Sequence, residues 1–331
     1  LRFVYCREKE MSLKILIMGS GAVGSYFGAV LHKAGHEVLF VARGSHLEAV
    51  RKNGLIVEST ASSNFTIYPN ITDILQPEYR AELILYCVKG YQNEAALELI
   101  STSVDSSTSI ITLQNGIGSG DLLTERFGQN NVLLGVTYID VMRPESGKVI
   151  ETSDRCNIIF GELGISDGSR AKELKKALDV DGIEVELATD ILKYVWQKFI
   201  YICGWSGMMS ITRSPMSAIM AVPEARRMTI DAMNEALEIA KAKSINIDED
   251  FMNETIKYFS HVGDDAVSSM LLDLLNGNPI EIDVINAAAV AMADSVGVST
   301  PVNSFITNVL RVHHAKVMSG IKKNKTNFKR R

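Results

Sequence analysis

A glycine-rich turn between an apolar run and a helical stretch constrains the fold of the N-terminal half. Residues 14–43 read KILIMGSGAVGSYFGAVLHKAGHEVLFVAR: an apolar run, the pattern G-x-G-x-x-G, a helical stretch that stops at a glycine, and a second apolar run. This order indicates a βαβ unit. In such a unit the first glycine permits a tight turn, the second admits a pyrophosphate to the backbone, and the third lets the helix pack against the strand. We expect a dinucleotide to bind at Gly19, Ser20, Gly21, Ala22, Val23 and Gly24.

The residue that ends the second apolar run bears on the choice of dinucleotide. An NAD-specific protein normally places Asp or Glu here, where the carboxylate accepts from the ribose hydroxyls. This chain has Arg43 instead. A guanidinium can pair with a 2′-phosphate, so the sequence favours NADP over NAD. The alternative is a surface arginine that binds no ligand.

The remaining pattern predicts two domains in an α/β chain. Further apolar runs at 82–88, 109–113 and 157–160 read as buried strands, and 132–141 with 148–152 reads as a hairpin that gives a mixed edge to a mostly parallel sheet. After Thr189 helical periodicity dominates to about residue 320. We expect a Rossmann-type domain over 11–188, an all-α domain over 189–321, and terminal extensions at 1–10 and 322–331.

Local signals place several helix ends in the second half. Thr189-Asp190 and Thr300-Pro301 each resemble a helix start, with a capping side chain followed by an acid or a proline in the first turn. Gly277 is a natural stop for a helix that begins near Asp265.

Charge and cysteine usage exclude several classes of partner. The net charge is −5, and residues 322–331 carry six basic groups and no acid, so the body of the chain is more acidic still and should not attract nucleic acid. The basic tail reads as a solvated terminus. The sequence contains no run of about 18 uncharged apolar residues, so it predicts no membrane span. Four scattered cysteines without metal-binding spacing indicate free thiols in a reducing compartment such as the cytoplasm, and no metal site; they are Cys6, Cys87, Cys156 and Cys203.

Lys198 is a candidate catalytic group on physical grounds alone. It lies in YVWQKFIYICGW, which is apolar around most of a helix and therefore indicates burial. Burial lowers the pKa of an unpaired lysine toward values that suit acid catalysis. The alternative is a side chain that extends its ammonium group to the surface.

Several motifs in order resemble the ketopantoate reductase family, the 2-dehydropantoate 2-reductases, from residue 14 to about residue 303. The matching pieces are GSGAVG, Val88-Lys89, Gln114-Asn115-Gly116, Trp196-Gln197-Lys198, Ser268-Ser269-Met270 with Asp273, Glu281-Ile282-Asp283 with Asn286, and Thr300-Pro301. The resemblance implies a helical domain similar to that of 6-phosphogluconate dehydrogenases. It also implies NADPH-dependent reduction of ketopantoate to pantoate in pantothenate biosynthesis, in the cytoplasm. Monomers and dimers both occur in the family, which leaves a homodimer open.

The resemblance assigns roles to five residues. It makes Lys198 the proton donor to the substrate carbonyl, and Glu281 the acid that positions this lysine and the substrate. Ser269 would bind the substrate carboxylate. Asn115 would lie beside nicotinamide and substrate, and Lys89 would bring positive charge near the cofactor. Glu281 would also contact the cofactor; without the resemblance it is an ordinary acid at the start of a helix.

Two positions on the face of Lys198 depart from the family. Family members usually carry asparagine one and two helical turns after the lysine, and this chain has Ile202 and Ser206. Before Glu281 the residues Asn278-Pro279-Ile280 lack the basic residue and threonine often found there. Without those amides the pocket discriminates poorly for a hydroxyl-bearing substrate. Alternatives are therefore a reductase of another 2-oxo acid with a more apolar tail, an opine-type or 3-hydroxy-acid dehydrogenase, and a non-catalytic NADP(H) sensor.

Overall fold

The computed structural model describes residues 12–153, 156–164, 168–264 and 266–320. Contacts among these residues divide the chain into two units. The first unit runs to Gln114 and again from Ser119 to Ile191, and the second holds Asn115–Gly118 and the described residues from Leu192 onward. The expected terminal extensions and Cys6 lie outside the described residues. Within the described ranges no helix is both long and apolar enough to cross a membrane.

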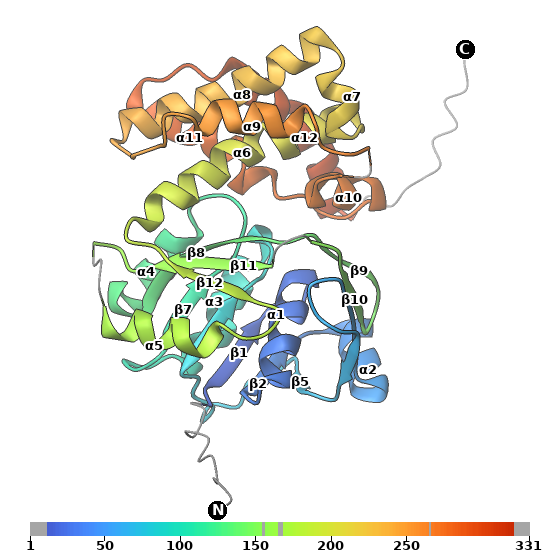
Figure 1. Ribbon diagram of the computed structural model, residues 1–331, viewed down its shortest axis with the longest axis vertical. Coiled ribbons are helices and arrows are strands. Elements are labelled where there is room, and N and C mark those ends of the chain that lie inside the picture. Colours follow the sequence, from blue (N-terminus) through green and yellow to red (C-terminus); the bar gives the residue numbers. More distant parts are fainter. Residues whose placement is uncertain (1–11, 154–155, 165–167, 265, 321–331) are drawn as a thin grey trace, which may run out of the picture. The chain divides into compact units, whose positions relative to one another are not determined.

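The described part of the first unit is built on an eight-stranded sheet with the strand order β12-β11-β8-β7-β6-β1-β2-β5 (Figure 1). Neighbouring strands run parallel, apart from β8 and β11, which pair antiparallel. The mostly parallel sheet predicted from the sequence is therefore confirmed. Its strands are β1 (Lys14–Met18), β2 (Glu37–Val41), β5 (Asn70–Thr72), β6 (Leu83–Tyr86), β7 (Ser109–Thr112), β8 (Val132–Tyr138), β11 (Asn157–Gly161) and β12 (Glu184–Leu187).

Helices cover both faces of this sheet because its central strands are apolar on both sides. In β1, Ile15 and Ile17 belong to one core cluster, and the alternate Leu16 and Met18 belong to another. The first cluster includes residues of α1 (Ala22–Lys33), α2 (Gly44–Asn53) and α5 (Ser169–Leu178). The second includes residues of α3 (Asn93–Ile100) and α4 (Ser119–Phe127). Short 3₁₀ turns complete the unit: η1 (Gly90–Gln92), η2 (Ser101–Ser103) and η3 (Gln129–Asn131).

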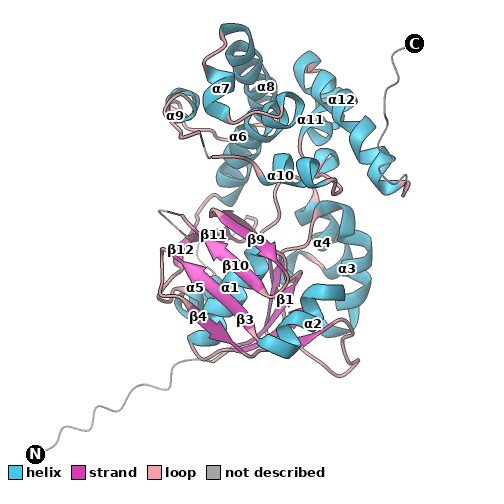
Figure 2. Ribbon diagram, turned by 90° about the vertical axis from the view of Figure 1, so that its right-hand side faces the viewer, coloured by secondary structure: helices cyan, strands magenta, loops and turns pink. Residues whose placement is uncertain are grey.

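The predicted hairpin is wrong in its first strand and in the sheet it joins. The large-sheet strand β8 ends at Tyr138, and the hairpin is formed by β9 (Val141–Glu145) and β10 (Lys148–Glu151). These strands lie in a separate sheet, four-stranded over the described residues, with the order β4-β3-β10-β9, where β3 is Leu55–Ser59 and β4 is Phe65–Ile67 (Figure 2). Because β9 is the edge strand, it tolerates Pro144. The mixed edge of the large sheet comes instead from β11.

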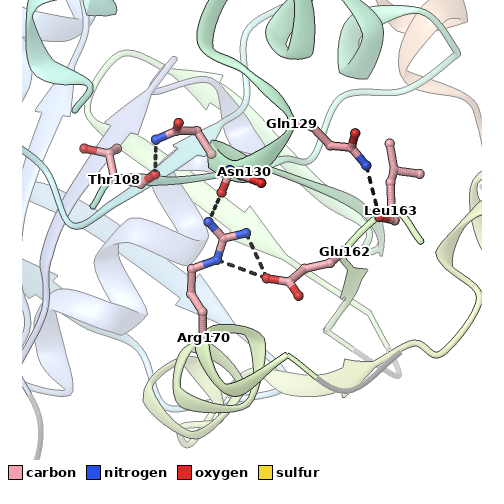
Figure 3. Close-up of polar contacts among 7 residues, drawn as sticks. Thr108, Gln129, Asn130, Glu162, Leu163 and Arg170 are labelled. Atoms are coloured by element: carbon pink, nitrogen blue, oxygen red, sulfur yellow. Dashed lines mark hydrogen bonds and ion pairs between the residues drawn. The ribbon is translucent and has the colours of Figure 1, made fainter. Parts of the chain in front are cut away.

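Polar contacts tie the start of β8, the end of β11 and α5 together (Figure 3). Arg170 in α5 donates from Nε and Nη2 to Glu162 Oε1, at 3.1 and 2.8 Å, and from Nη1 to the carbonyl oxygen of Asn130. Asn131 Nδ2 donates to the Thr108 carbonyl at 2.7 Å. These contacts join residues next to β7, β8 and β11 with α5, through groups that are far apart in the sequence.

The second unit consists of helices and loops over its described residues (Figure 2). The helices are α6 (Ile191–Thr212), α7 (Met216–Met220), α8 (Pro223–Ala242), α9 (Phe251–Phe259), α10 (Ser269–Asn276), α11 (Asn286–Val296) and α12 (Pro301–Met318), with the 3₁₀ turn η4 (Ile282–Val284) before α11. The predicted helical character of this region is confirmed. Its core contains residues from both sides of α6, among them Phe199, Ile200, Cys203 and Met209.

Helix ends in this unit follow the local signals in part. Thr300 is the N-cap of α12, with Pro301 in its first turn, and Gly277 ends α10 in the left-handed conformation at φ 71°. The start of α10 was predicted wrongly, since the helix begins at Ser269 behind the N-cap Ser268 and not near Asp265. Residue 265 itself lies outside the described residues.

Candidate active site

The glycine turn has the geometry that a dinucleotide pyrophosphate requires. Gly19 has φ +102°, and a Cβ there would lie 2.8 Å from the backbone nitrogen of Val88. A Cβ on Gly24 would collide with the Gly19 carbonyl oxygen, so both positions need glycine. Space above Gly21 is open, with nothing within 4 Å of the position that a Cβ would take. Ser20 Oγ is buried and has no hydrogen-bond partner among the described residues. An open backbone with an unused buried hydroxyl fits an incoming phosphate.

The turn lies where ligands bind in open α/β sheets. Strand β1 stands between β2 and β6, so the strands that follow it in the sequence lie on opposite sides of it, and the strand order reverses at this point. Val88, which crowds Gly19, follows β6, and its carbonyl oxygen accepts from Gln114 Nε2 at 2.7 Å. Lys89 comes next and caps the 3₁₀ turn η1. Ala22 and Val23, which were predicted to contact the cofactor, lie in the first turn of α1. The structure thus gathers the ends of β1 and β6, with Lys89, around the predicted phosphate site.

Arg43 occupies the residue before α2, at the end of β2. It is exposed, and no ion pair links it to an acid within the described residues. A cation at this place is available to a charged group on the adenosine ribose.

Lys198 lies in the middle of α6, among the core residues of the second unit. Trp196, Phe199 and Ile202 beside it are buried. Burial lowers the pKa of Lys198 to about 8, against the carboxylate of Glu281, which raises it. The side chain retains some solvent-accessible surface. A group with this pKa exchanges protons near neutral pH, as a general acid must.

Glu281 is buried, with 5% of its surface exposed, and it precedes the 3₁₀ turn η4. The helix that we expected Glu281 to open is therefore a single 3₁₀ turn, and α11 begins only at Asn286. A buried carboxylate is stable only with charged or hydrogen-bonding neighbours. Its electrostatic effect on Lys198 shows that the two groups lie near each other in the second unit.

The loop after β7, which carries Asn115, contacts the 3₁₀ turn η4 that follows Glu281. Ile117 donates its backbone N–H to the Val284 carbonyl oxygen at 3.0 Å. Gly116 has φ +87°, and a Cβ there would collide with the same oxygen. Residues Asn115–Gly118 therefore belong to the helical unit although both flanking segments belong to the sheet unit. Sequence reasoning selected Asn115 but missed the role of Gly116 and Val284; the glycine directly after Asn115 was the available signal.

The residues assigned to the substrate occupy two helices of this unit. Ile202 and Ser206 follow Lys198 at helical spacing in α6, and both are buried. Ser269 is exposed at the first position of α10, where Ser268 Oγ accepts from the Leu271 N–H at 3.1 Å. Helical spacing thus places an apolar side chain one turn after Lys198 and a hydroxyl group two turns after it, on the same face of α6. The place of Ser269 relative to the substrate stays a prediction.

A buried polar network that the sequence analysis missed connects α6 with α8, α11 and α12. Glu235 accepts from the backbone N–H of Val302 at 2.7 Å and from Asn303 Nδ2 at 2.7 Å. Asn303 Oδ1 in turn accepts from Asn286 Nδ2, which also donates to the Cys203 carbonyl of α6 at 3.0 Å. The carboxylate thereby caps α12, and the two asparagines connect α12, α11 and α6. The sequence motif around Asn286 reflects this support.

Burial keeps two of the described cysteines from forming thiolates near neutral pH. Cys87, Cys156 and Cys203 are free thiols. Burial raises the pKa of Cys87 to about 12 and that of Cys156 to about 11, so both stay protonated at neutral pH. The described residues contain no group of three or more metal-ligating side chains.

A Rossmann-type unit with a phosphate-ready glycine turn, together with a helical unit that carries a low-pKa lysine near a buried carboxylate, defines a two-domain dinucleotide-dependent dehydrogenase. Comparison with protein families agrees. The model described as "Ketopantoate reductase PanE/ApbA" matches residues 15–164, and the model of its C-terminal domain matches residues 190–314. The chain belongs to the ketopantoate reductase family. It is an oxidoreductase of the class that acts on CH–OH groups and uses a nicotinamide cofactor.

Individual relatives cover almost the whole chain at low identity. A 2-dehydropantoate 2-reductase of Pyrococcus horikoshii is 28% identical over 88% of this chain and 94% of its own. The crystal structure of 2-dehydropantoate 2-reductase from Geobacter metallireducens has 27% identity and a TM-score of 0.84, covering 90% of this chain and 99% of the other. D-mandelate dehydrogenase in a ternary structure with NADH and anilino(oxo)acetate has 25% identity and a TM-score of 0.85, covering 92% and 99%.

Proposed function

We propose that this protein reduces a 2-oxo acid to a 2-hydroxy acid with NADPH, and that ketopantoate is its foremost substrate. The observation that carries the proposal is Lys198, a lysine of the helical unit with a pKa near 8, close to the buried Glu281. Reduction of a carbonyl needs one hydride and one proton, and a lysine that titrates near neutral pH is suited to supply the proton. The relatives named as 2-dehydropantoate 2-reductases support this substrate class.

Each candidate residue of the chain has a separate role in this reaction. A nicotinamide cofactor held by the glycine turn would supply the hydride that the carbonyl carbon accepts. Lys198 Nζ gives its proton to the carbonyl oxygen in the same step and is left neutral. Glu281 orients the ammonium group and favours its charged form. Ser269 holds the substrate carboxylate, and Asn115 contacts both substrate and nicotinamide. Lys89 adds positive charge beside the phosphate turn.

The preference for NADPH rests on Arg43. Changing Arg43 to Glu should raise the KM for NADPH by about 100-fold, because the carboxylate repels a 2′-phosphate that the guanidinium attracts. The KM for NADH should change by less than about threefold, since NADH carries no such phosphate. Initial-rate kinetics with both cofactors measure the two effects. Equal changes in the two KM values would remove the assignment of Arg43.

The buried Ile202 favours a second candidate substrate class, 2-oxo acids with an apolar tail. D-mandelate dehydrogenase, a neighbour of similar fold named for a 2-hydroxy acid with a phenyl group, supports this class. An isoleucine one turn after Lys198 offers no hydrogen bond to a substrate hydroxyl. Discrimination for the hydroxyl of ketopantoate should then be weak.

A substrate panel tests both the reaction and the tail preference. We expect NADPH oxidation with ketopantoate and with 3,3-dimethyl-2-oxobutanoate, which lacks only the hydroxyl, and kcat/KM values that differ by less than about tenfold. Phenylglyoxylate tests a bulkier tail, and pyruvate tests the unbranched limit. A preference of about 1000-fold for ketopantoate would refute the weak discrimination. Tight NADPH binding without turnover of any member would contradict the reductase and favour a sensor.

A further inference from the structure

The β9–β10 hairpin is fastened to the first turn of α2, next to Arg43. The backbone N–H of Gly147 in the hairpin turn donates to His46 Nδ1 at 3.0 Å, and Ser45 Oγ lies 2.9 Å from Ser146 Oγ. A Cβ on Gly147, at φ +84°, would stand 3.2 Å from the Ala49 Cβ, so the turn packs closely on α2. The hairpin and the helix therefore hold a fixed position relative to each other within the first unit.

His46 extends this connection to the glycine turn. Its ring is buried, with 3% of its surface exposed, and its Nε2 lies 3.4 Å from Ser25 Oγ in α1. Ser25 Oγ donates to the Ser20 carbonyl oxygen at 3.1 Å. Burial and the nearby Arg143 guanidinium lower the pKa of His46 to about 4. The imidazole is therefore neutral near pH 7, and it acts as a brace between three segments and not as a cation.

Arg143 places a second guanidinium in this corner. It follows Val141 and the exposed Met142 in β9, and Val141 packs against the core cluster that contains Tyr26 and Val50 of α1 and α2. Its electrostatic effect on His46 places its charge near the first turn of α2. The side chain has exposed surface, yet enough protein surrounds the guanidinium that burial lowers its pKa.

Arg43 and Arg143 are cations without a matching acid. Within the described ranges no ion pair is formed by either one. Two acids of α2 and β3 pair with other cations: Glu48 contacts Arg51 at 3.6 Å, and Glu58 contacts Lys148 at 2.6 Å. A partly desolvated, unpaired guanidinium is costly unless an anion joins it. Arg43 precedes Ser45 by two residues and Arg143 precedes Ser146 by three, so the two segments joined by these serines carry guanidinium and hydroxyl donors of the kind that a phosphate accepts.

We propose that Arg143, from the hairpin of the small sheet, is a second ligand of the 2′-phosphate of NADP(H), together with Arg43 and the hydroxyl groups of Ser45 and Ser146. The proposal rests on the NADPH preference inferred above. The end of β2 is where the adenosine ribose of a bound dinucleotide lies, and the fastened hairpin brings Arg143 to that end. Recognition of the 2′-phosphate is thus shared between the Rossmann sheet and the small sheet.

The test compares two ligands that differ only in this phosphate, adenosine 2′,5′-bisphosphate and 5′-AMP, by isothermal titration calorimetry. Wild-type protein should bind the bisphosphate more tightly. Changing Arg143 to Gln should weaken bisphosphate binding about tenfold and leave the Kd for 5′-AMP within about twofold. Arg126→Gln is the matched control, because Arg126 lies in the same unit and pairs with Glu98 at 3.5 Å. It should change neither Kd, and the thermal unfolding midpoint verifies that each variant is folded.

The outcomes separate this proposal from the one on which it rests. Equal wild-type affinity for the two ligands would refute both the NADPH preference and the role of Arg143 as a ligand of the 2′-phosphate. A wild-type preference that survives Arg143→Gln would overturn the role of Arg143 alone. A similar loss for both ligands in a folded variant would also overturn it, since Arg143 would then serve the 5′-phosphate. A loss confined to the bisphosphate supports the proposal.

Discussion

Changing Lys198 to Met is expected to lower kcat for 2-oxo acid reduction by about 10³-fold or more, with the Kd for NADPH within about twofold of wild type. Methionine fills the volume of the lysine stem in the apolar surroundings of α6 but has no proton to give. Hydride transfer would then leave an alkoxide without a donor. The change leaves the buried Glu281 carboxylate without a nearby cation, so the variant should unfold at a lower temperature than the wild type, and the thermal unfolding midpoint verifies that it is folded under assay conditions. Steady-state kinetics and fluorescence titration of NADPH measure the two quantities.

Lys193 provides the matched control on the same helix. It is paired with Asp248 at 2.7 Å, away from the role assigned to Lys198. Lys193→Met should retain kcat within about threefold. If Lys198→Met kept near-normal turnover, the proton would come from another group, and the mechanism would be wrong. If it lost NADPH binding as well as turnover, Lys198 would serve the cofactor and not the carbonyl oxygen.

Changing Glu281 to Gln is expected to move the pH profile as well as the rate. The Glu281 carboxylate raises the pKa of Lys198, against the effect of burial, so its removal should bring that pKa below its present value of about 8. The protonated lysine is the active form, so the pH above which kcat declines should move down. At pH 7.5 kcat should fall by about 10- to 100-fold, because less of the lysine is charged and its ammonium is less well oriented.

Asp283→Asn is the control for this experiment. Asp283 is exposed, two residues after Glu281, and its carboxylate lies 3.9 Å from the Arg311 guanidinium and 3.8 Å from His314 Nε2. The profile of Asp283→Asn should match the wild type. A lower kcat in Glu281→Gln with an unmoved profile would limit Glu281 to a structural role. Glu281→Asp, which keeps the charge, should retain more of the wild-type profile than Glu281→Gln.

Local patterns in the sequence predicted the parts of the fold that local chemistry determines. The apolar runs at β1, β6 and β7 are buried on both faces, which is why they read as strands without alternation. The spacing of Gly19, Gly21 and Gly24 is sufficient to predict the turn, because each glycine meets a neighbouring backbone or leaves space for a ligand. Thr300-Pro301 and Gly277 mark helix ends for similar local reasons.

The errors and omissions concern contacts between distant segments. The predicted hairpin was wrong because nothing within 132–152 indicates that the chain changes sheets after Tyr138. The change of sheet depends on the pairing of β10 with β3, which lies much earlier in the sequence. The capture of Asn115–Gly118 by the helical unit depends on the Val284 carbonyl, far along the chain. Glu235 looks like an ordinary helix residue until its contacts with Val302 and Asn303 are seen. Arg143 belongs to the same category, because the hairpin that carries it is joined to α2 through Ser146 and Gly147.

The central claim is that the Lys198 ammonium group, held near neutral pKa by its surroundings, protonates the reacting carbonyl. The most direct measurement is the pH dependence of the single-turnover rate of NADPH oxidation in the wild-type protein, with saturating ketopantoate or the best member of the panel. The rate should be level below about pH 7 and fall about tenfold per pH unit above about pH 8, as the lysine loses its proton. A rate that stays level up to pH 10, or rises with pH, would contradict the claim.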